Sequence, residues 1–84
     1  MPYIDQKDRQ VFEGAIQELT NIVMSPGELN YVITRLIHGY VNFHGIKYDY
    51  LNDVVGVLEN AKIEFLRRVV GPYEDKKAKI NGDI

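Results

Sequence analysis

The sequence predicts an all-α fold, in which three helices form an up-down bundle and a short fourth helix follows at the C-terminal end. Two observations lead to this prediction. Apolar residues recur at intervals of three and four along three segments, which is the spacing of one face of an α-helix. Alternation of apolar and polar residues never runs beyond a few positions, so strands are not indicated. The connections are short, which favours antiparallel neighbouring helices.

The first helix is expected to begin after Asp5 as N-cap and to end near Met24. Its apolar stripe consists of Phe12, Ala15, Ile16, Leu19, Ile22 and Val23. Ser25-Pro26-Gly27-Glu28 then predicts a break followed at once by a second helix. Ser25 is the expected N-cap, Pro26 occupies the first helical position, and Glu28 stands at the capping-box spacing.

The second helix is expected to run to Gly45, where glycine can adopt the left-handed conformation that ends a helix. Its core side carries Leu29, Val32, Ile33, Leu36, Tyr40 and Phe43. A third helix begins at Tyr48 or Asp49, and we expect Gly71-Pro72 to end it, because proline disfavours helical geometry in the residue before it. From Pro72 to Asn81, acids come before lysines, which suits a short fourth helix that needs a docking surface.

Composition limits the class of protein. The chain has 84 residues, a formal net charge of −2 and no cysteine, so we expect one domain over residues 1–84 with neither disulfides nor thiolate metal sites. No apolar run is long enough for a membrane span, and the first residues lack the pattern of a signal peptide. We therefore expect a cytoplasmic protein without a cofactor.

Catalytic and metal-binding patterns are weak. His38 and His44 are six residues apart, which is not the spacing of a helical metal pair, so no metal site is expected. No glycine-rich phosphate loop or nucleophile motif occurs. A magnesium-dependent nucleotide hydrolase using Asp49, Asp53, Glu59 or Glu64 remains a minor alternative, although the usual paired acidic motifs are missing. We expect a protein that is not an enzyme.

A polar and aromatic stripe on the second helix is the more distinctive feature. It contains Asn30, Tyr31, Thr34, Arg35, His38 and Asn42, where a solvated helix face would carry lysine and glutamate. On the third helix, Glu64 precedes Arg67 and Arg68 by three and four residues, and one of the two arginines is expected to pair with it. Three interpretations stay open, namely a surface ion pair, an anion-binding pocket made by Arg35 with Arg67 or Arg68, and a polar subunit interface.

Charge is distributed unevenly along the chain. Residues 1–61 carry a net charge of −4 and residues 62–84 a net charge of +2. A nucleic-acid accessory protein that uses the basic C-terminal third is therefore an alternative. The modest excess of positive charge makes it the less favoured one.

Several stretches resemble an uncharacterised family of short phage, bacterial and archaeal proteins, catalogued as a domain of unknown function. The resemblance covers nearly the whole chain, including GELNYVITR at 27–35, NDVVGVLE at 52–59, EFLRRVV at 64–70, PYEDKK at 72–77 and NGD at 81–83. It implies a bacteriophage or mobile-element setting. We expect a self-associating binding protein in the host cytoplasm, which holds an anionic, nucleotide-like ligand or the acidic surface of a host protein.

Overall fold

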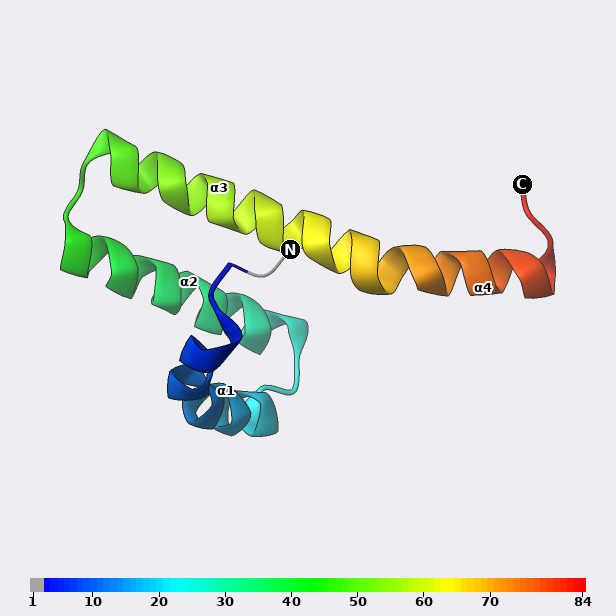
Figure 1. Cartoon of the computed structure of the whole chain (residues 1–84), viewed down its shortest axis with the longest axis horizontal. Coiled ribbons are helices and arrows are strands. Elements are labelled where there is room, and N and C mark those ends of the chain that lie inside the picture. Colours follow the sequence, from blue (N-terminus) through cyan, green and yellow to red (C-terminus); the bar gives the residue numbers. More distant parts are fainter. Residues whose placement is uncertain (1–2) are drawn as a thin grey trace. The chain divides into compact units, whose positions relative to one another are not determined.

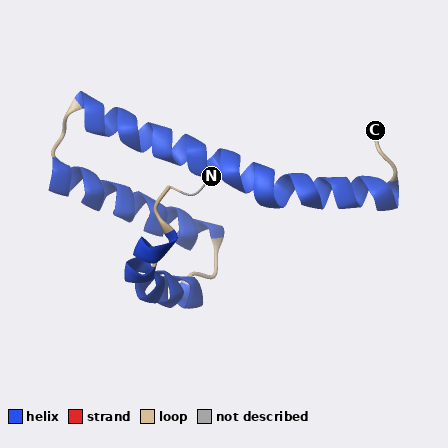
Figure 2. Ribbon diagram, in the orientation of Figure 1, coloured by secondary structure: helices blue, strands red, loops and turns tan. Residues whose placement is uncertain are grey.

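A computed structural model describes residues 3–84 and is helical nearly throughout, with no strand in this range (Figures 1 and 2). The all-α prediction is confirmed. The elements in order are a 3₁₀ turn η1 (Gln6–Asp8), α1 (Gln10–Ile22), α2 (Pro26–His44), α3 (Tyr48–Phe65), a π-helical turn η2 (Leu66–Val70) and α4 (Gly71–Asn81). The chain divides into an N-terminal unit, Met1–His44, and a C-terminal unit, Gly45–Ile84, which we describe separately.

In the N-terminal unit, the first helix begins later than the sequence suggested. Asp5 is extended and precedes η1, where its carbonyl oxygen accepts a hydrogen bond from the Asp8 amide at 2.9 Å. Its carboxylate makes no capping hydrogen bond. Helix α1 starts only after Arg9, because one tight 3₁₀ turn comes first.

The turn between α1 and α2 contains the expected capping box. The Glu28 amide donates to Ser25 Oγ at 3.1 Å, and Glu28 Oε1 accepts hydrogen bonds from the amides of Ser25 at 3.0 Å and Met24 at 2.8 Å. These contacts satisfy backbone donors that would otherwise lack partners at the start of α2. Helix α2 ends at His44, and Gly45 follows with φ of 101°, as the sequence predicted.

In the C-terminal unit, helix α3 starts at Tyr48, one of the two predicted positions. The predicted end at Gly71-Pro72 is wrong. The backbone stays helical from α3 through η2 into α4, and Figure 1 shows one continuous helix that runs from green through yellow and orange to red. The fourth helix is therefore an extension of the third and not a separate element.

The π turn explains how the helix passes Pro72. Gly71 donates its amide hydrogen bond to the carbonyl of Leu66, five residues earlier, which widens the turn that precedes the proline ring. A Cβ atom at Gly71 would lie 3.3 Å from that carbonyl oxygen, so glycine suits this close approach. A Gly-Pro pair in a sequence usually predicts the end of a helix. Here the wider π turn lets the helix continue through Pro72.

Within residues 3–84, neither unit has a buried core. Among the described residues no side chain is fully buried, and large apolar residues of every α-helix are exposed by 40% or more, for example Phe12, Leu29, Leu58 and Tyr73. The arrangement of the helices as a bundle, and the single-domain organisation, remain predictions. None of the described helices is long and apolar enough to cross a membrane.

The capping box leads to a prediction on pH. Hydrogen bonds from the amides of Met24 and Ser25 lower the pKa of Glu28 below its ordinary value of 4.5. A carboxyl whose pKa is lowered by folding stabilises the fold fully above the unfolded pKa, and this contribution decreases as the pH falls toward the folded pKa. We expect the free energy of unfolding of the wild type, relative to Glu28→Gln, to be greater at about pH 6 than at about pH 3.

Urea unfolding at a fixed protein concentration measures this difference. Glu18→Gln removes an exposed carboxylate outside the capping box and controls for the change in net charge. An equal pH dependence in both variants would contradict the role given to Glu28.

Candidate functional site

The structure divides the predicted site residues between the two units. Asn30, Tyr31, Arg35 and His38 lie on α2 in the N-terminal unit, whereas Glu64, Arg67 and Arg68 lie at the junction of α3 and η2 in the C-terminal unit. Each group is described by itself.

Glu64, Arg67 and Arg68 form a compact ionic cluster. Arg68 Nε donates to Glu64 Oε2 at 2.7 Å, and Arg67 Nη2 lies 3.2 Å from the same oxygen. The Glu64 side chain is 22% exposed, while the two arginines are exposed by about 60%. Sequence spacing suggested one partner, yet both arginines reach Glu64, because residues three and four positions further along a helix lie on its side.

The two guanidinium groups retain donors beyond these contacts. A guanidinium carries five N–H groups, and the structure gives each arginine only Glu64 as a hydrogen-bonding partner among the described residues. Their exposed N–H groups can therefore donate hydrogen bonds to a further carboxylate or phosphate in addition to Glu64. This cluster combines the surface ion pair with the capacity to bind an anion.

On α2 the predicted polar stripe is exposed. Thr34 Oγ1 donates to Asn30 Oδ1 at 3.3 Å, which links two of its residues one helical turn apart. Arg35 makes no hydrogen bond or ion pair within the described residues. Because its charge is not neutralised locally, Arg35 is the cation of this unit best suited to an external anion.

Tyr31 also borders an apolar hollow within the N-terminal unit. The hollow lies between α1 and α2. It shares Leu19, Val23 and Val32 with an apolar groove along the same two helices. Together they are lined by Ile16, Leu19, Thr20, Ile22, Val23, Gly27, Glu28, Leu29, Tyr31, Val32, Ile33 and Leu36. The polar stripe thus adjoins an apolar surface at Tyr31.

Sequence reasoning missed an aromatic cluster at the end of α2. The rings of Tyr40 and His44 stack with centroids 4.1 Å apart, and Phe43 meets His44 edge-on at 5.0 Å. His44 Nδ1 donates to the carbonyl of Tyr40 at 2.9 Å, since a carbonyl oxygen can only accept. Tyr40 and His44 are four residues apart on a predicted helix, and this spacing could have indicated that their rings meet.

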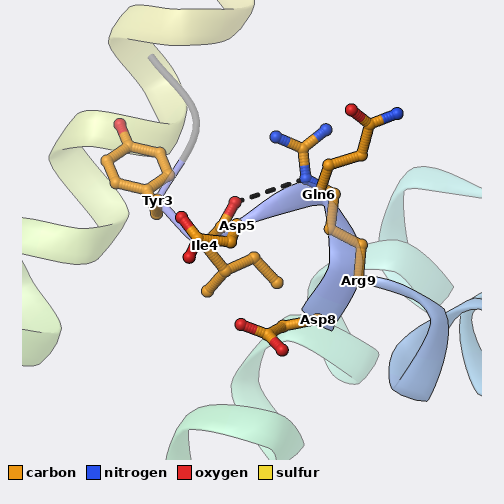
Figure 3. Close-up of a pocket in the computed structure, with 6 residues that line it drawn as sticks. All are labelled: Tyr3, Ile4, Asp5, Gln6, Asp8 and Arg9. Carbon is orange, nitrogen blue, oxygen red and sulfur yellow. Dashed lines mark hydrogen bonds between the residues drawn. The ribbon is translucent and has the colours of Figure 1, made fainter.

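A second hollow, at the start of the N-terminal unit, also escaped the sequence analysis. Figure 3 shows Arg9 turned back so that its Nε donates to the carbonyl of Ile4 at 3.3 Å. Tyr3, Ile4, Asp5, Gln6, Asp8 and Arg9 line this hollow. One guanidinium and two carboxylates are among its lining groups, so it has no excess of positive charge for an anion.

No group of three or more histidine and acidic side chains is placed to hold a metal ion within residues 3–84. The acidic residues Asp49, Asp53 and Glu59 are spread along α3. The hydrolase alternative would require them to converge.

Comparison with known proteins gives one result. The model of a family described as Domain of unknown function (DUF6899) matches residues 1–84. The chain belongs to this family. No curated protein and no solved structure matches it. The match confirms the predicted membership of a family of unknown function.

The shared carboxylate of the ionic cluster leads to a prediction. Arg67→Ala and Arg68→Ala each leave one guanidinium on Glu64, so we expect each to change the free energy of unfolding by less than about 0.5 kcal/mol. The double variant removes both guanidinium groups from this cluster, and its loss should exceed the sum of the single losses. Urea unfolding of the four proteins measures this.

The exposed pair of Lys62 with Glu59, with 4.0 Å between Nζ and Oε1, provides the control. Lys62→Ala combined with Arg68→Ala should give additive losses. Additivity in the Arg67 and Arg68 double variant as well would show that the two arginines act independently.

Proposed function

We propose that this chain is a small binding protein without enzymatic activity, which self-associates through its helices and holds an anionic, nucleotide-like ligand or an acidic partner surface. The observation behind the proposal is the absence of any fully buried residue among the described ones, combined with exposed apolar stripes on the helices.

The energetic argument favours association. Ordering a residue costs about 1–2 kcal/mol of backbone entropy, and burial of apolar area is the main compensation, at roughly 25 cal/mol per Å². Helices whose apolar stripes stay in water lack that compensation. Packing against further copies supplies it, and we propose that the up-down bundle is completed in this way between chains.

The ligand assignment concerns the arginines. Arg35 has no local counter-ion among the described residues, and Arg67 and Arg68 keep exposed N–H groups beside Glu64. Asn30, Tyr31 and His38 add neutral donors and aromatic surface on the same helix as Arg35. Guanidinium groups with neighbouring amide and ring donors suit a phosphate or carboxylate.

The biological setting follows from the family resemblance. We propose a phage or mobile-element protein that works in the host cytoplasm, where the partner is a host protein or a nucleotide signal.

A nucleic-acid accessory role is the second candidate. Residues 66–81 carry five lysines and arginines against two acids, and phosphate contacts by such residues give salt-dependent binding. Retention on heparin and DNA that falls with rising salt would favour this role over the first proposal. Absence of retention would remove it.

The ligand proposal predicts the behaviour of Arg35→Ala. A hydrogen bond to a charged group contributes about 1.5–3 kcal/mol, so loss of Arg35 should weaken binding of an anion roughly 10-fold to 100-fold. Thermal shift with nucleoside triphosphates and cyclic nucleotides as probes measures this, because a ligand that binds the folded state raises the melting temperature. Lys62→Ala, which removes an exposed cation elsewhere, should retain the shift.

Sedimentation distinguishes the two roles of Arg35. The ligand role predicts an unchanged mass for Arg35→Ala, whereas a lower mass would assign Arg35 to the interface. No thermal shift with any of the nucleotides in the wild type would contradict the nucleotide-like ligand.

A further inference from the structure

The continuous helix of the C-terminal unit carries a regular apolar stripe. Leu51, Leu58, Phe65, Tyr73 and Ile80 follow one another at intervals of seven, seven, eight and seven residues. Intervals of seven place residues on nearly the same side of a helix and are typical of a helix that packs against another along its length.

The interval of eight coincides with the π turn. Residues 66–70, between Phe65 and Tyr73, form η2, in which the hydrogen bonds span five residues instead of four. A π turn takes one extra residue into the helix. The interval of eight therefore acts as an interval of seven, and Tyr73 and Ile80 fall on the same side as the three residues of α3.

All five side chains are exposed, by 41% to 64%. The π turn thus extends one apolar stripe along residues 48–81, which is roughly 50 Å of helix. Phe65 is at its centre, with two apolar layers on either side.

Charge along this helix changes sign at the same point. Helix α3 carries four acids and one lysine, a net charge of −3, whereas residues 66–81 carry five lysines and arginines and two acids, a net charge of +3. A partner that covers the whole stripe should therefore be positive at one end and negative at the other.

We infer that the partner is the same helix of a second copy, packed antiparallel with Phe65 at the two-fold axis. This arrangement places Leu51 against Ile80 and Leu58 against Tyr73. It brings the negative half of each helix against the positive half of the other, and it places Asp53 level with the segment that contains Lys77 and Lys79. Parallel pairing would instead oppose like charges along the entire length.

The length of the stripe also favours a second copy over the helices of the N-terminal unit. Helices α1 and α2 have 13 and 19 residues, or roughly 20 and 28 Å. Neither one covers a stripe of five layers alone. The same helix from a second chain matches it in length, in the position of every layer and in charge.

The inference rests on the proposed self-association and is tested by directed crosslinking. The chain has no cysteine, so single variants report one position each. We expect a mixture of L51C and I80C chains to form disulfide-linked dimers at least about tenfold faster than L51C alone, because pairing raises the effective concentration of facing thiols. A mixture of L58C and Y73C chains repeats the test in case either of the first variants fails to fold.

Asn60 lies on the opposite side of the helix from Leu51, nine residues along, so N60C mixed with I80C measures random encounters. Rapid crosslinking of L51C alone would establish parallel pairing and overturn the inference. Crosslinking of both mixtures at the rate of the control, in a protein that light scattering shows to be oligomeric, would overturn the antiparallel register and leave self-association intact. A monomer by light scattering would overturn both.

Discussion

Amphipathic helices have to remove their apolar stripes from water, and the rest of this structure follows from that requirement. The chain builds well-formed helices with a good capping box, yet no described side chain is fully buried. Helix propensity and capping contribute fractions of the free energy that packing normally supplies. The exposed apolar stripes are therefore the basis of the proposed association.

The π turn connects this requirement to a specific geometry. Without it, the extra residue between Phe65 and Tyr73 would turn the apolar residues of α4 away from those of α3 by about 100°. With it, one stripe continues through both helices, and Gly71 and Pro72 become parts of a helix. The π turn lies at the middle of the stripe, at the point where the charge along the helix also changes sign. This coincidence is the main support for the proposed pairing of two copies.

Some local features of the fold were predictable from the sequence, whereas the Asp5 N-cap and the helix end at Gly71-Pro72 were not. The capping box of Ser25 and Glu28 and the helix end at Gly45 depend on neighbouring residues alone, and both were correct. The end predicted at Gly71-Pro72 failed because a five-residue hydrogen bond decides it, and residue spacing does not reveal such a bond in advance. Helical spacing predicted that one arginine pairs with Glu64, and the structure places both Arg67 and Arg68 on it. Any relation between Arg35 and Arg67 or Arg68 depends on packing, which periodicity does not determine.

The central claim, that the helices acquire their core by association, is tested most directly by the dependence of thermal unfolding on protein concentration. Circular dichroism melting curves at about 1 to about 100 micromolar, combined with sedimentation at the same concentrations, provide the measurement. The account predicts a melting temperature that rises with concentration and a mass that is a multiple of 9.7 kDa. A constant melting temperature together with a mass of 9.7 kDa at every concentration would contradict it.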